Sequence, residues 1–288
     1  MPAFSVSEIR KGGRVVEGTA LEKRHTGNGI ESSNLSLSAM LKLISLNVER
    51  SRHLARNLPF FLAERPDVLC LQEAFEADLE RFQAELEMPF LAWQPDVLIY
   101  KETNSTGKAG YSGQAILSRY PLNETGEEYY YMPEGGILLE MKEMADVRST
   151  NAQGVIWVSV EKDGEVFTIA NTHFTWTPDG YPNAYQETDF VSLQTILAQL
   201  PPHLFVGDLN APRGGGIWER FAALYERDNI PAEIASTIDP AWHRFPHLTH
   251  VVDCLFSDAA YHVQGVRIVA GVSDHRAVVA EIERSKVL

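Results

Sequence analysis

Residues 271–280 read Gly-Val-Ser-Asp-His-Arg-Ala-Val-Val-Ala. Asp274 and His275 therefore lie in a turn of small residues, directly before an apolar run that is rich in β-branched side chains. Such a run is typical of a strand in a protein core. The pattern predicts a carboxylate and an imidazole side by side at one end of a core strand, open to a cleft.

The same arrangement occurs at several other places along the chain. Apolar runs lead into Asn47, Glu73 and the pair Asp208 and Asn210, His173 follows another such run, and Asp253 lies early in one. A strand that delivers polar side chains at its end places them at a sheet edge, where ligands can reach them. We expect these side chains to form one site.

Strands and helices alternate from residue 41 onward, and this alternation predicts one α/β domain with mixed sheets. Strands are expected at 41–48, 67–71, 96–100, 114–118, 155–161, 166–171, 203–207, 251–257, 263–269 and 276–283, and helices at 51–64, 75–86, 183–200 and 217–225. The Asp-Gly pair at 163–164 indicates a hairpin turn. Residues 122–153 suggest an insertion with a hairpin, in which Tyr129, Tyr130 and Tyr131 either pack in a strand or stack on a substrate.

Residues 1–39 are polar, rich in Gly and Ser, and show no sustained period. We expect a leader that is disordered or derived from an expression vector, followed by a single domain over 40–288.

Composition limits the class of protein further. Hydrophobic residues make up 44% and charged residues 22% of the 288 positions, as in ordinary globular proteins. No apolar stretch approaches the roughly 20 residues of a membrane span. Cys70 and Cys254 lie in apolar runs and are expected to be buried and reduced, which favours the cytoplasm. A net charge of −14 argues against indiscriminate binding to nucleic acid, yet a divalent metal can neutralise a phosphate locally.

The residue types at the strand ends suit phosphate chemistry. Asn47 can hold a carboxylate or ligate a metal, and Glu73 is a good ligand for a hard cation. Each also has a structural alternative, a turn residue for Asn47 and a charge at a helix N-terminus for Glu73. His173 can bind a phosphate oxygen or protonate a leaving group, or can be a structural histidine.

The stretch 205–212, Phe-Val-Gly-Asp-Leu-Asn-Ala-Pro, is the most informative of these clusters. Asp208 can orient an attacking water, and the Asn210 amide can donate to a phosphate oxygen, whereas an Asx-turn would explain only one of the two. Asp253 needs a partner if it is buried, and His275 can supply one. Such a pair fixes the tautomer of the imidazole and raises its basicity.

The order and contexts of these motifs resemble the endonuclease/exonuclease/phosphatase superfamily, whose members include deoxyribonuclease I, sphingomyelinases and deadenylases. The resemblance spans 41–283 and rests on seven motifs in order: Leu-Asn-Val (46–48), Leu-Gln-Glu (71–73), Ala-Ile-Leu-Ser-Arg-Tyr-Pro-Leu (115–122), Asn-Thr-His-Phe (171–174), Gly-Asp-Leu-Asn-Ala-Pro (207–212), Val-Asp-Cys-Leu-Phe (252–256) and Ser-Asp-His-Arg-Ala-Val (273–278). It implies a four-layer sandwich in which two mixed β-sheets are flanked by helices.

The resemblance also implies roles for the site residues. Glu73 would be the principal ligand of Mg²⁺ or Mn²⁺, with Asn47 and Asp274 close to it. Asp208 would position or deprotonate the water, and Asn210 and His173 would hold the phosphate. His275, oriented by Asp253, would stabilise developing negative charge or act as acid and base.

We therefore expect a metal-dependent phosphoesterase that hydrolyses a phosphodiester or phosphomonoester by water attack, without an obligate protein partner. Few basic residues can reach the cleft, namely Arg213, Arg244, His247 and His250, and no basic residue directly precedes Asp253. This favours a small phosphorylated molecule or a lipid headgroup as substrate. The alternatives are a nuclease or DNA-end-processing phosphodiesterase and, more remotely, a catalytically silent binding module.

Overall fold

The computed structural model describes residues 39–100, 107, 109–137 and 147–285, without the side chains of Val147 and Asp179. The expected leader, except for its last residue, and the middle of the expected insertion, 138–146, lie outside the described residues.

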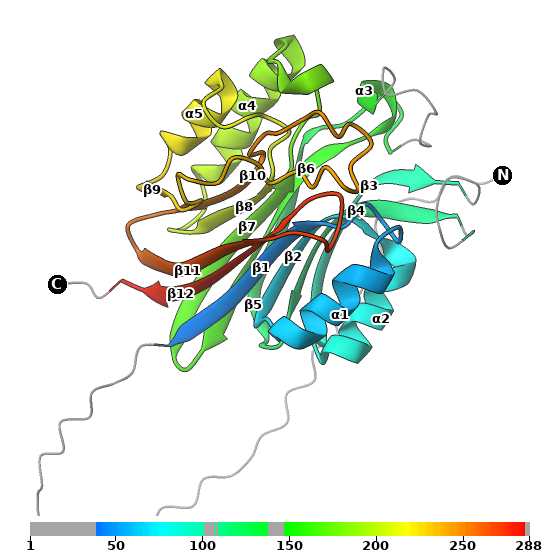
Figure 1. The fold of residues 1–288 in the computed structure, drawn as a ribbon. Helices are drawn as coiled ribbons and strands as arrows, with labels where there is room; N and C mark the ends of the chain where they lie inside the picture. Colours follow the sequence, from blue (N-terminus) through cyan, green and yellow to red (C-terminus); the bar gives the residue numbers. More distant parts are fainter. Residues whose placement is uncertain (1–38, 101–106, 108, 138–146, 286–288) are drawn as a thin grey trace, which may run out of the picture. The chain divides into compact units, whose positions relative to one another are not determined.

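Twelve strands of the described chain form two mixed sheets of six strands each, which lie between two layers of helices (Figure 1). Sheet A has the order β11-β12-β1-β2-β4-β3 and sheet B the order β5-β6-β7-β8-β10-β9. The strands are β1 (Met40–Asn47), β2 (Val68–Phe75), β3 (Phe90–Ile99), β4 (Gly110–Ser118), β5 (Leu122–Tyr131), β6 (Gln153–Lys162), β7 (Glu165–His173), β8 (Leu204–Asp208), β9 (Arg227–Asp228), β10 (Asp253–Ser257), β11 (Tyr261–Val269) and β12 (Ala277–Arg284). The predicted four-layer α/β sandwich is confirmed.

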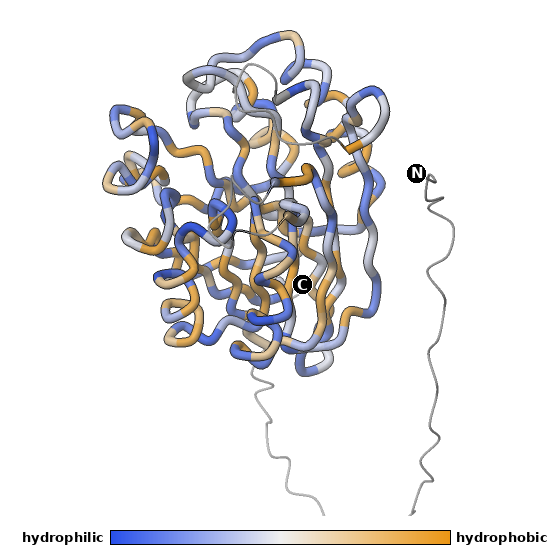
Figure 2. Tube along the Cα trace, turned by 90° about the vertical axis from the view of Figure 1, so that its right-hand side faces the viewer, coloured by the Kyte–Doolittle hydropathy of each residue, from blue (hydrophilic) through white to orange (hydrophobic). Residues whose placement is uncertain are grey.

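Both faces of the central strands are apolar because both are covered. In β1, Leu41 and Leu43 belong to the core that joins the two sheets, whereas Ile44 and Leu46 belong to the core beneath the first two helices. Figure 2 shows the hydrophobic residues gathered along the strands and the hydrophilic ones in the connecting loops.

The outer layers are helices that pack on the sheets through aromatic side chains. The helices α1 (Leu54–Glu64) and α2 (Glu76–Leu86) cover sheet A. The ring centroids of Phe61 on α1 and Phe82 on α2 lie 5.9 Å apart. On sheet B, α4 (Ala184–Leu197) and α5 (Gly216–Ala222) contact each other through Phe190 and Phe221, whose ring centroids lie 4.7 Å apart. A short α3 (Val147–Thr150) and a 3₁₀ turn, η3 (Pro178–Gly180), complete the described helices, none of which is long and apolar enough to cross a membrane.

The strand directions bring the expected site residues to one edge. β1 runs parallel to β2, and β7 runs parallel to β8, so these four strands end on the same side. β12 runs antiparallel to β1, and β10 runs antiparallel to β8, so both begin where the others end. Four strand ends and two strand starts therefore meet in one place.

Two polar side chains join the sheets just behind this edge. The Gln72 amide donates to the Asn171 side chain at 2.6 Å, and the Asn171 amide donates to the Leu71 carbonyl at 2.9 Å. Gln72 lies at a register shift between β2 and β4, where one strand carries an extra residue. Because of this irregularity, Gln72 can lie in the interior between the sheets while its neighbour Glu73 lies at the edge.

Gly207 is required by the close approach of β8 to β7. Its φ is +138°, and a Cβ atom at this position would lie 1.9 Å from the carbonyl oxygen of Thr172. Any side chain here would push apart the two strands that carry His173 and Asp208.

Most element boundaries lie within two residues of the expectations, but several differ by more. The strand β2 ends at Phe75 rather than at 71, and β4 begins at Gly110 rather than at 114. The helices α4 and α5 end at Leu197 and Ala222 rather than at 200 and 225.

The helix α1 begins at Leu54 rather than at 51, because 51–53 form a turn. The strand β3 begins at Phe90 rather than at 96, with Pro95 at a register shift. The expected insertion hairpin is wrong for its first part, since 122–131 form the edge strand β5 paired with β6, in which Tyr130 packs into the core.

Candidate active site

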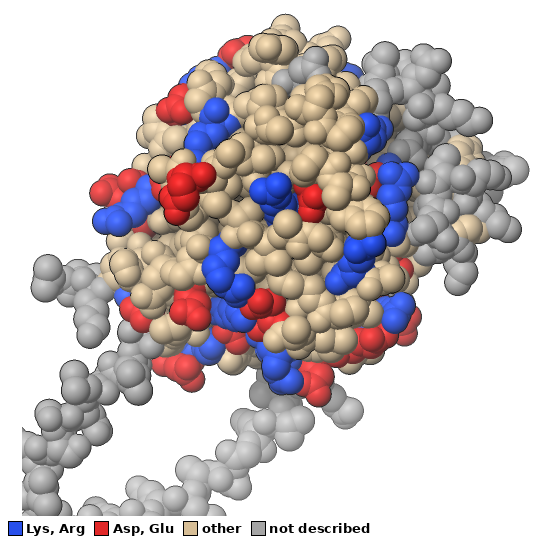
Figure 3. All heavy atoms as spheres, in the orientation of Figure 1, with Lys and Arg blue, Asp and Glu red and all other residues tan. Residues whose placement is uncertain are grey.

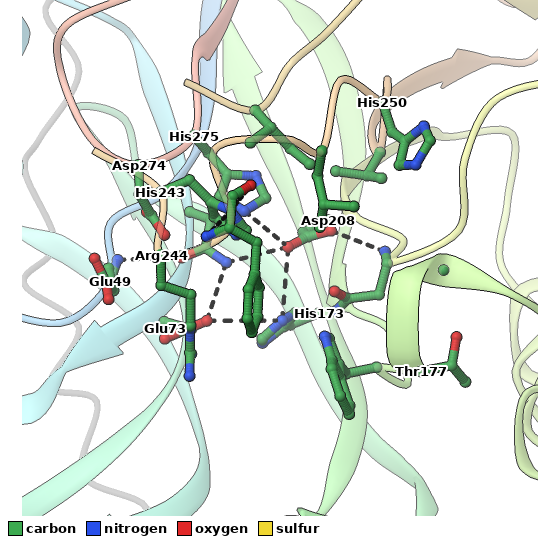
Figure 4. A pocket seen from close by; sticks show the side chains of 18 of the residues that line it. Glu49, Glu73, His173, Thr177, Asp208, His243, Arg244, His250, Asp274 and His275 are labelled. Carbon is green, nitrogen blue, oxygen red and sulfur yellow. Dashed lines mark hydrogen bonds and ion pairs between the residues drawn. The ribbon is translucent and has the colours of Figure 1, made fainter. Parts of the chain in front are cut away.

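Asp208 lies at the centre of the polar cluster at the sheet edge (Figure 4). Its side chain is almost fully buried, and three donors approach Oδ2. The Asn47 amide donates at 3.1 Å, His275 Nε2 lies at 3.6 Å, and His173 Nε2 lies at 3.7 Å. These contacts come from β1, β7 and the turn before β12, so polar groups from both sheets surround a single carboxylate oxygen.

The predicted pairing of Asp253 with His275 is present. Nδ1 of His275 lies 2.9 Å from Asp253 Oδ2, and Nε2 faces Asp208. Burial disfavours charge on His275, but the carboxylates of Asp253 and Asp208 outweigh it and hold the pKa of His275 well above its ordinary value. The two carboxylates therefore favour the protonated form of His275, which suits an anionic ligand.

Glu73 is held at the same edge by Asn47, whose amide donates to Oε1 at 3.2 Å. Burial alone would raise the pKa of Glu73, yet His173, Arg50 and this hydrogen bond lower it to about 2. The Asn47 oxygen accepts from the backbone N–H of Glu49 at 3.1 Å. Of the two roles expected for Asn47, its contacts match that of holding a carboxylate.

Three carboxylates, those of Glu49, Glu73 and Asp274, line one corner of the cavity. Burial raises the pKa of Asp274, and the charges of Glu49 and Glu73 raise it further, although His275 opposes them. One oxygen each of Glu49 and Asp274 and a ring nitrogen of His53 lie within 4.8 Å of one another. Carboxylate oxygens are the donors that a divalent cation prefers, and Glu49, Glu73 and Asp274 are the residues that would hold it.

Asn210 forms the Asx-turn that was one alternative for the 205–212 stretch. Its backbone N–H donates to Asp208 Oδ1 at 2.8 Å, which is the Asx-turn contact, and its φ is +48°. Its side-chain amide donates to the Phe174 carbonyl at 2.9 Å, while the residue lines the cavity. This turn fixes Asp208 and leaves Asn210 beside it.

A cavity of about 640 Å³ opens above the cluster and has the size of a small-molecule site. One wall is the loop before β10, which brings His243, Arg244 and Phe245 over the site. His243 contacts the His275 ring edge-on at 6.0 Å. The opposite wall, after β7, contributes Trp176 and Thr177.

The loop before β10 is fixed in place from two sides. Its Asp239 accepts from the backbone N–H of Gly271 at 2.7 Å and donates its own N–H to the Asp274 carbonyl at 2.7 Å. Trp242 packs against the Arg56 guanidinium at 3.6 Å and against the His53 ring at 6.0 Å. The wall of the cavity is therefore tied to α1 and to the loop that carries Asp274.

All eight predicted site residues meet around this cavity, with Asp253 behind His275. Of the basic residues expected near the cleft, Arg244 and His250 line the cavity, whereas Arg213 donates to the carbonyls of Ile230 and Pro231. Five residues at the site were not predicted from the sequence: Glu49, Arg50, Arg52, His53 and His243. Glu49 carried a detectable signal, since it lies two residues after Asn47, but His53 and His243 come from turns and loops without any pattern.

The site is buried, acidic and rich in imidazoles, and it lies at the edge of a two-sheet α/β sandwich. A family model described as the Endonuclease/Exonuclease/phosphatase family matches residues 44–275. The chain belongs to this family, whose members are hydrolases acting on phosphoester bonds.

Solved structures of low sequence identity share the fold. An endonuclease/exonuclease/phosphatase family protein from Leptotrichia buccalis is 17% identical, with a TM-score of 0.63 over 84% of this chain and 99% of that one. The human Nocturnin catalytic domain with bound sulfate is 18% identical, with a TM-score of 0.60 over 85% and 94%. Sphingomyelinase C from Streptomyces griseocarneus is 16% identical, with a TM-score of 0.54 over 85% and 99%. A search of curated protein sequences gave no significant match.

Proposed function

We propose that this protein hydrolyses a small phosphoester, using water as the nucleophile and Mg²⁺ or Mn²⁺ as the cofactor. The observation that carries the proposal is the convergence of His173, His275 and Asn47 on one oxygen of the buried Asp208, with Glu73 beside them. A carboxylate that can direct a water therefore stands among donors that can bind the oxygens of a phosphate.

Each residue has a chemical task in this proposal. Asp208 orients the attacking water and takes its proton. His275, kept cationic by Asp253, neutralises charge that develops on the phosphate oxygens, and His173 and Asn210 hold those oxygens. A cation held by Glu49, Glu73 and Asp274 would supply Lewis-acid chemistry at the phosphate and the leaving oxygen.

Charge distribution supports a small substrate over a long nucleic acid. The net charge is −14, and the face drawn in Figure 3 intersperses Lys and Arg with acidic and uncharged side chains. Long nucleic acids are bound largely through clusters of Lys and Arg that neutralise phosphates. A small phosphorylated molecule or a lipid headgroup is therefore the substrate class that we propose. The free, buried cysteines Cys70 and Cys254 support a reducing compartment such as the cytoplasm.

The test is hydrolysis of a panel of phosphomonoesters, phosphodiesters and oligonucleotides, with Mg²⁺, with Mn²⁺ and with EDTA. We expect metal-dependent release of product from small phosphoesters. The variants Glu73→Gln and Asp208→Asn should each lose roughly 10³-fold or more in kcat, a loss typical of charge-stabilising groups in active sites.

Two exposed residues provide matched controls, Glu80→Gln on α2 and Asp163→Asn in the hairpin turn, and both should retain activity. Cleavage of DNA at low enzyme concentration would overturn the small-substrate assignment and support the nuclease alternative. Binding of phosphoesters without turnover would support a silent binding module.

A further inference from the structure

The cavity extends on both sides of the phosphate-handling residues. On the Glu73 side it reaches the ends of β3 and β4, where Asp96, Ser112 and Asn151 form its lining. On the Asn210 side it continues into a second cavity of about 410 Å³. The two cavities share four lining residues: Gly180, Pro212, Leu248 and His250. Figure 4 shows Glu49 and Glu73 on one side of Asp208, and His250 and Thr177 on the other.

The first extension, the polar arm, is defined by Asp96, Ser112 and Asn151. Asp96 is only 7% exposed, and its Oδ1 has no hydrogen-bond partner among the described residues. A buried carboxyl oxygen without a partner is costly unless a ligand or water completes it. The polar arm therefore suits a group that brings its own hydroxyl or other hydrogen-bonding atoms.

The second extension, the ring-lined arm, is defined by Tyr181, His247, Leu248 and His250. Tyr181 is 76% exposed and lines the second cavity. The Phe245 ring is edge-on to the His247 ring, with 6.1 Å between the ring centroids, and Phe245 lines the first cavity. Aromatic side chains bind flat rings by stacking or edge contacts.

A phosphomonoester has one organic group and would leave one arm empty, whereas a phosphodiester has two and would fill both. We propose, on the basis of the proposed function, that the substrate is a phosphodiester whose retained group carries a flat ring in the ring-lined arm. The leaving group, with its hydrogen-bonding atoms, occupies the polar arm beside Glu73.

The reaction balances with water as the only co-reactant. The oxygen of the water bonds to phosphorus, and the water gives one proton to the Asp208 carboxylate. The bond between phosphorus and the leaving oxygen breaks, and that oxygen departs with the bonding electrons and takes up the proton that the water released. The products are an alcohol and a phosphomonoester of the ring-bearing group.

Three probes that share the p-nitrophenolate leaving group test this assignment with the full chain and Mg²⁺. They are p-nitrophenyl phosphate, methyl p-nitrophenyl phosphate and phenyl p-nitrophenyl phosphate. We expect kcat/KM for the phenyl diester to exceed that for the methyl diester by about tenfold, the value of one good aromatic contact. The monoester should be the poorest of the three.

The variant Tyr181→Ala should lower the phenyl-to-methyl ratio of kcat/KM several-fold, because it removes the aromatic contact with the phenyl group. Tyr185→Ala is the matched control, because this exposed tyrosine lies four residues further along and lines neither cavity. It should retain the parent ratio.

The outcomes separate the inference from the function on which it rests. If the monoester is the best substrate, or if Tyr181→Ala leaves the ratio unchanged, the two-armed assignment is wrong while the phosphoesterase stands. If no probe is hydrolysed with either metal, or if Glu73→Gln is as active as the parent, the proposed function itself fails.

Discussion

At the scale of single residues, the site depends on a chain of carboxylate–imidazole contacts. Asp253 is 2% exposed and lies behind His275, which in turn faces Asp208. Thr237 Oγ1 accepts the backbone N–H groups of Val252 and Asp253 at 3.0 and 3.1 Å, which fixes the position of the buried carboxylate. Asp253 therefore acts through His275 and is a positioning residue.

Replacing Asp253 with Asn should lower the pKa of His275, because one of the three negative charges that raise it disappears. If cationic His275 is needed for turnover, activity falls as pH rises through this pKa, and the variant should lose activity at a lower pH than the parent. We expect kcat near neutral pH to fall by roughly 10²- to 10⁴-fold.

The measurements are a pH–rate profile and an NMR titration of the His275 ring in metal-free protein. Asp163→Asn, in an exposed turn, is the control. An alkaline limb and a ring titration that both stay where they are in the parent would show that Asp253 has a purely structural role.

The site residues that could be predicted from the sequence share one property, which is that each adjoins an apolar run. Asn47 and Asp208 end their strands, and Glu73 lies near the end of β2, so the strand directions bring all three to one edge. Glu49 was not predicted because its position depends on a left-handed backbone conformation, with φ of +45°, that turns the chain back toward the site. His243 was not predicted because tertiary contacts, such as that between Trp242 and Arg56, hold its loop in place.

At the scale of elements, the distance between β7 and β8 controls the distance between His173 and Asp208. The two strands pair in parallel, and His173 is the register partner of Asp208. Gly207 allows this pairing to continue to the last residue of β8, because it presents no side chain to Thr172.

Gly207→Ala should therefore destabilise the protein. The added methyl group would meet a backbone oxygen, and alanine disfavours a φ of +138°. We expect the free energy of unfolding to fall by at least about 2 kcal/mol, measured by urea denaturation.

Gly216→Ala is the matched control, since a Cβ there meets no atom within 4 Å and its φ is not in the left-handed range. Residue 216 is the first of α5, so the control should be neutral or slightly stabilising. Equal effects of the two substitutions would contradict the steric role of Gly207.

Element boundaries were predictable where a period was uninterrupted and failed where tertiary pairing replaced it. β3 contains Pro95, which breaks a strand pattern in sequence but is tolerated here at a register shift. β5 is mostly polar, as edge strands are, so its Asn-Glu-Thr-Gly-Glu-Glu stretch gave no strand signal. Only its pairing with β6 makes it a strand.

At the scale of the whole molecule, the site concentrates negative charge in an acidic protein. Glu49, Glu73 and Asp274 line the same cavity, and the charges of Glu49 and Glu73 raise the pKa of Asp274. A bound cation would relieve this repulsion only in the folded state, so binding and folding are coupled.

We therefore expect Mg²⁺ or Mn²⁺ to raise the melting temperature relative to EDTA. At a free metal concentration 100 times Kd, the stabilisation should be about 2.7 kcal/mol, which corresponds to a rise of several degrees. Calorimetry of the parent, Glu73→Gln and the control Glu80→Gln measures this effect. The metal-dependent rise should shrink in Glu73→Gln and persist in the control, and an equal rise in all three would place the cation elsewhere.

The amide contacts between Gln72 and Asn171 have a consequence for how the molecule is aligned. Apolar faces of two sheets can slide over each other with little change in buried area, because dispersion and hydrophobic contacts have no fixed direction. Hydrogen bonds do have a direction, and a shift by one residue would leave these buried amides without partners. Since Glu73 belongs to one sheet and Asp208 to the other, the offset between the sheets sets the separation of the two carboxylates. Gln72 and Asn171 therefore help to set the separation of the two carboxylates, although neither needs to touch the substrate.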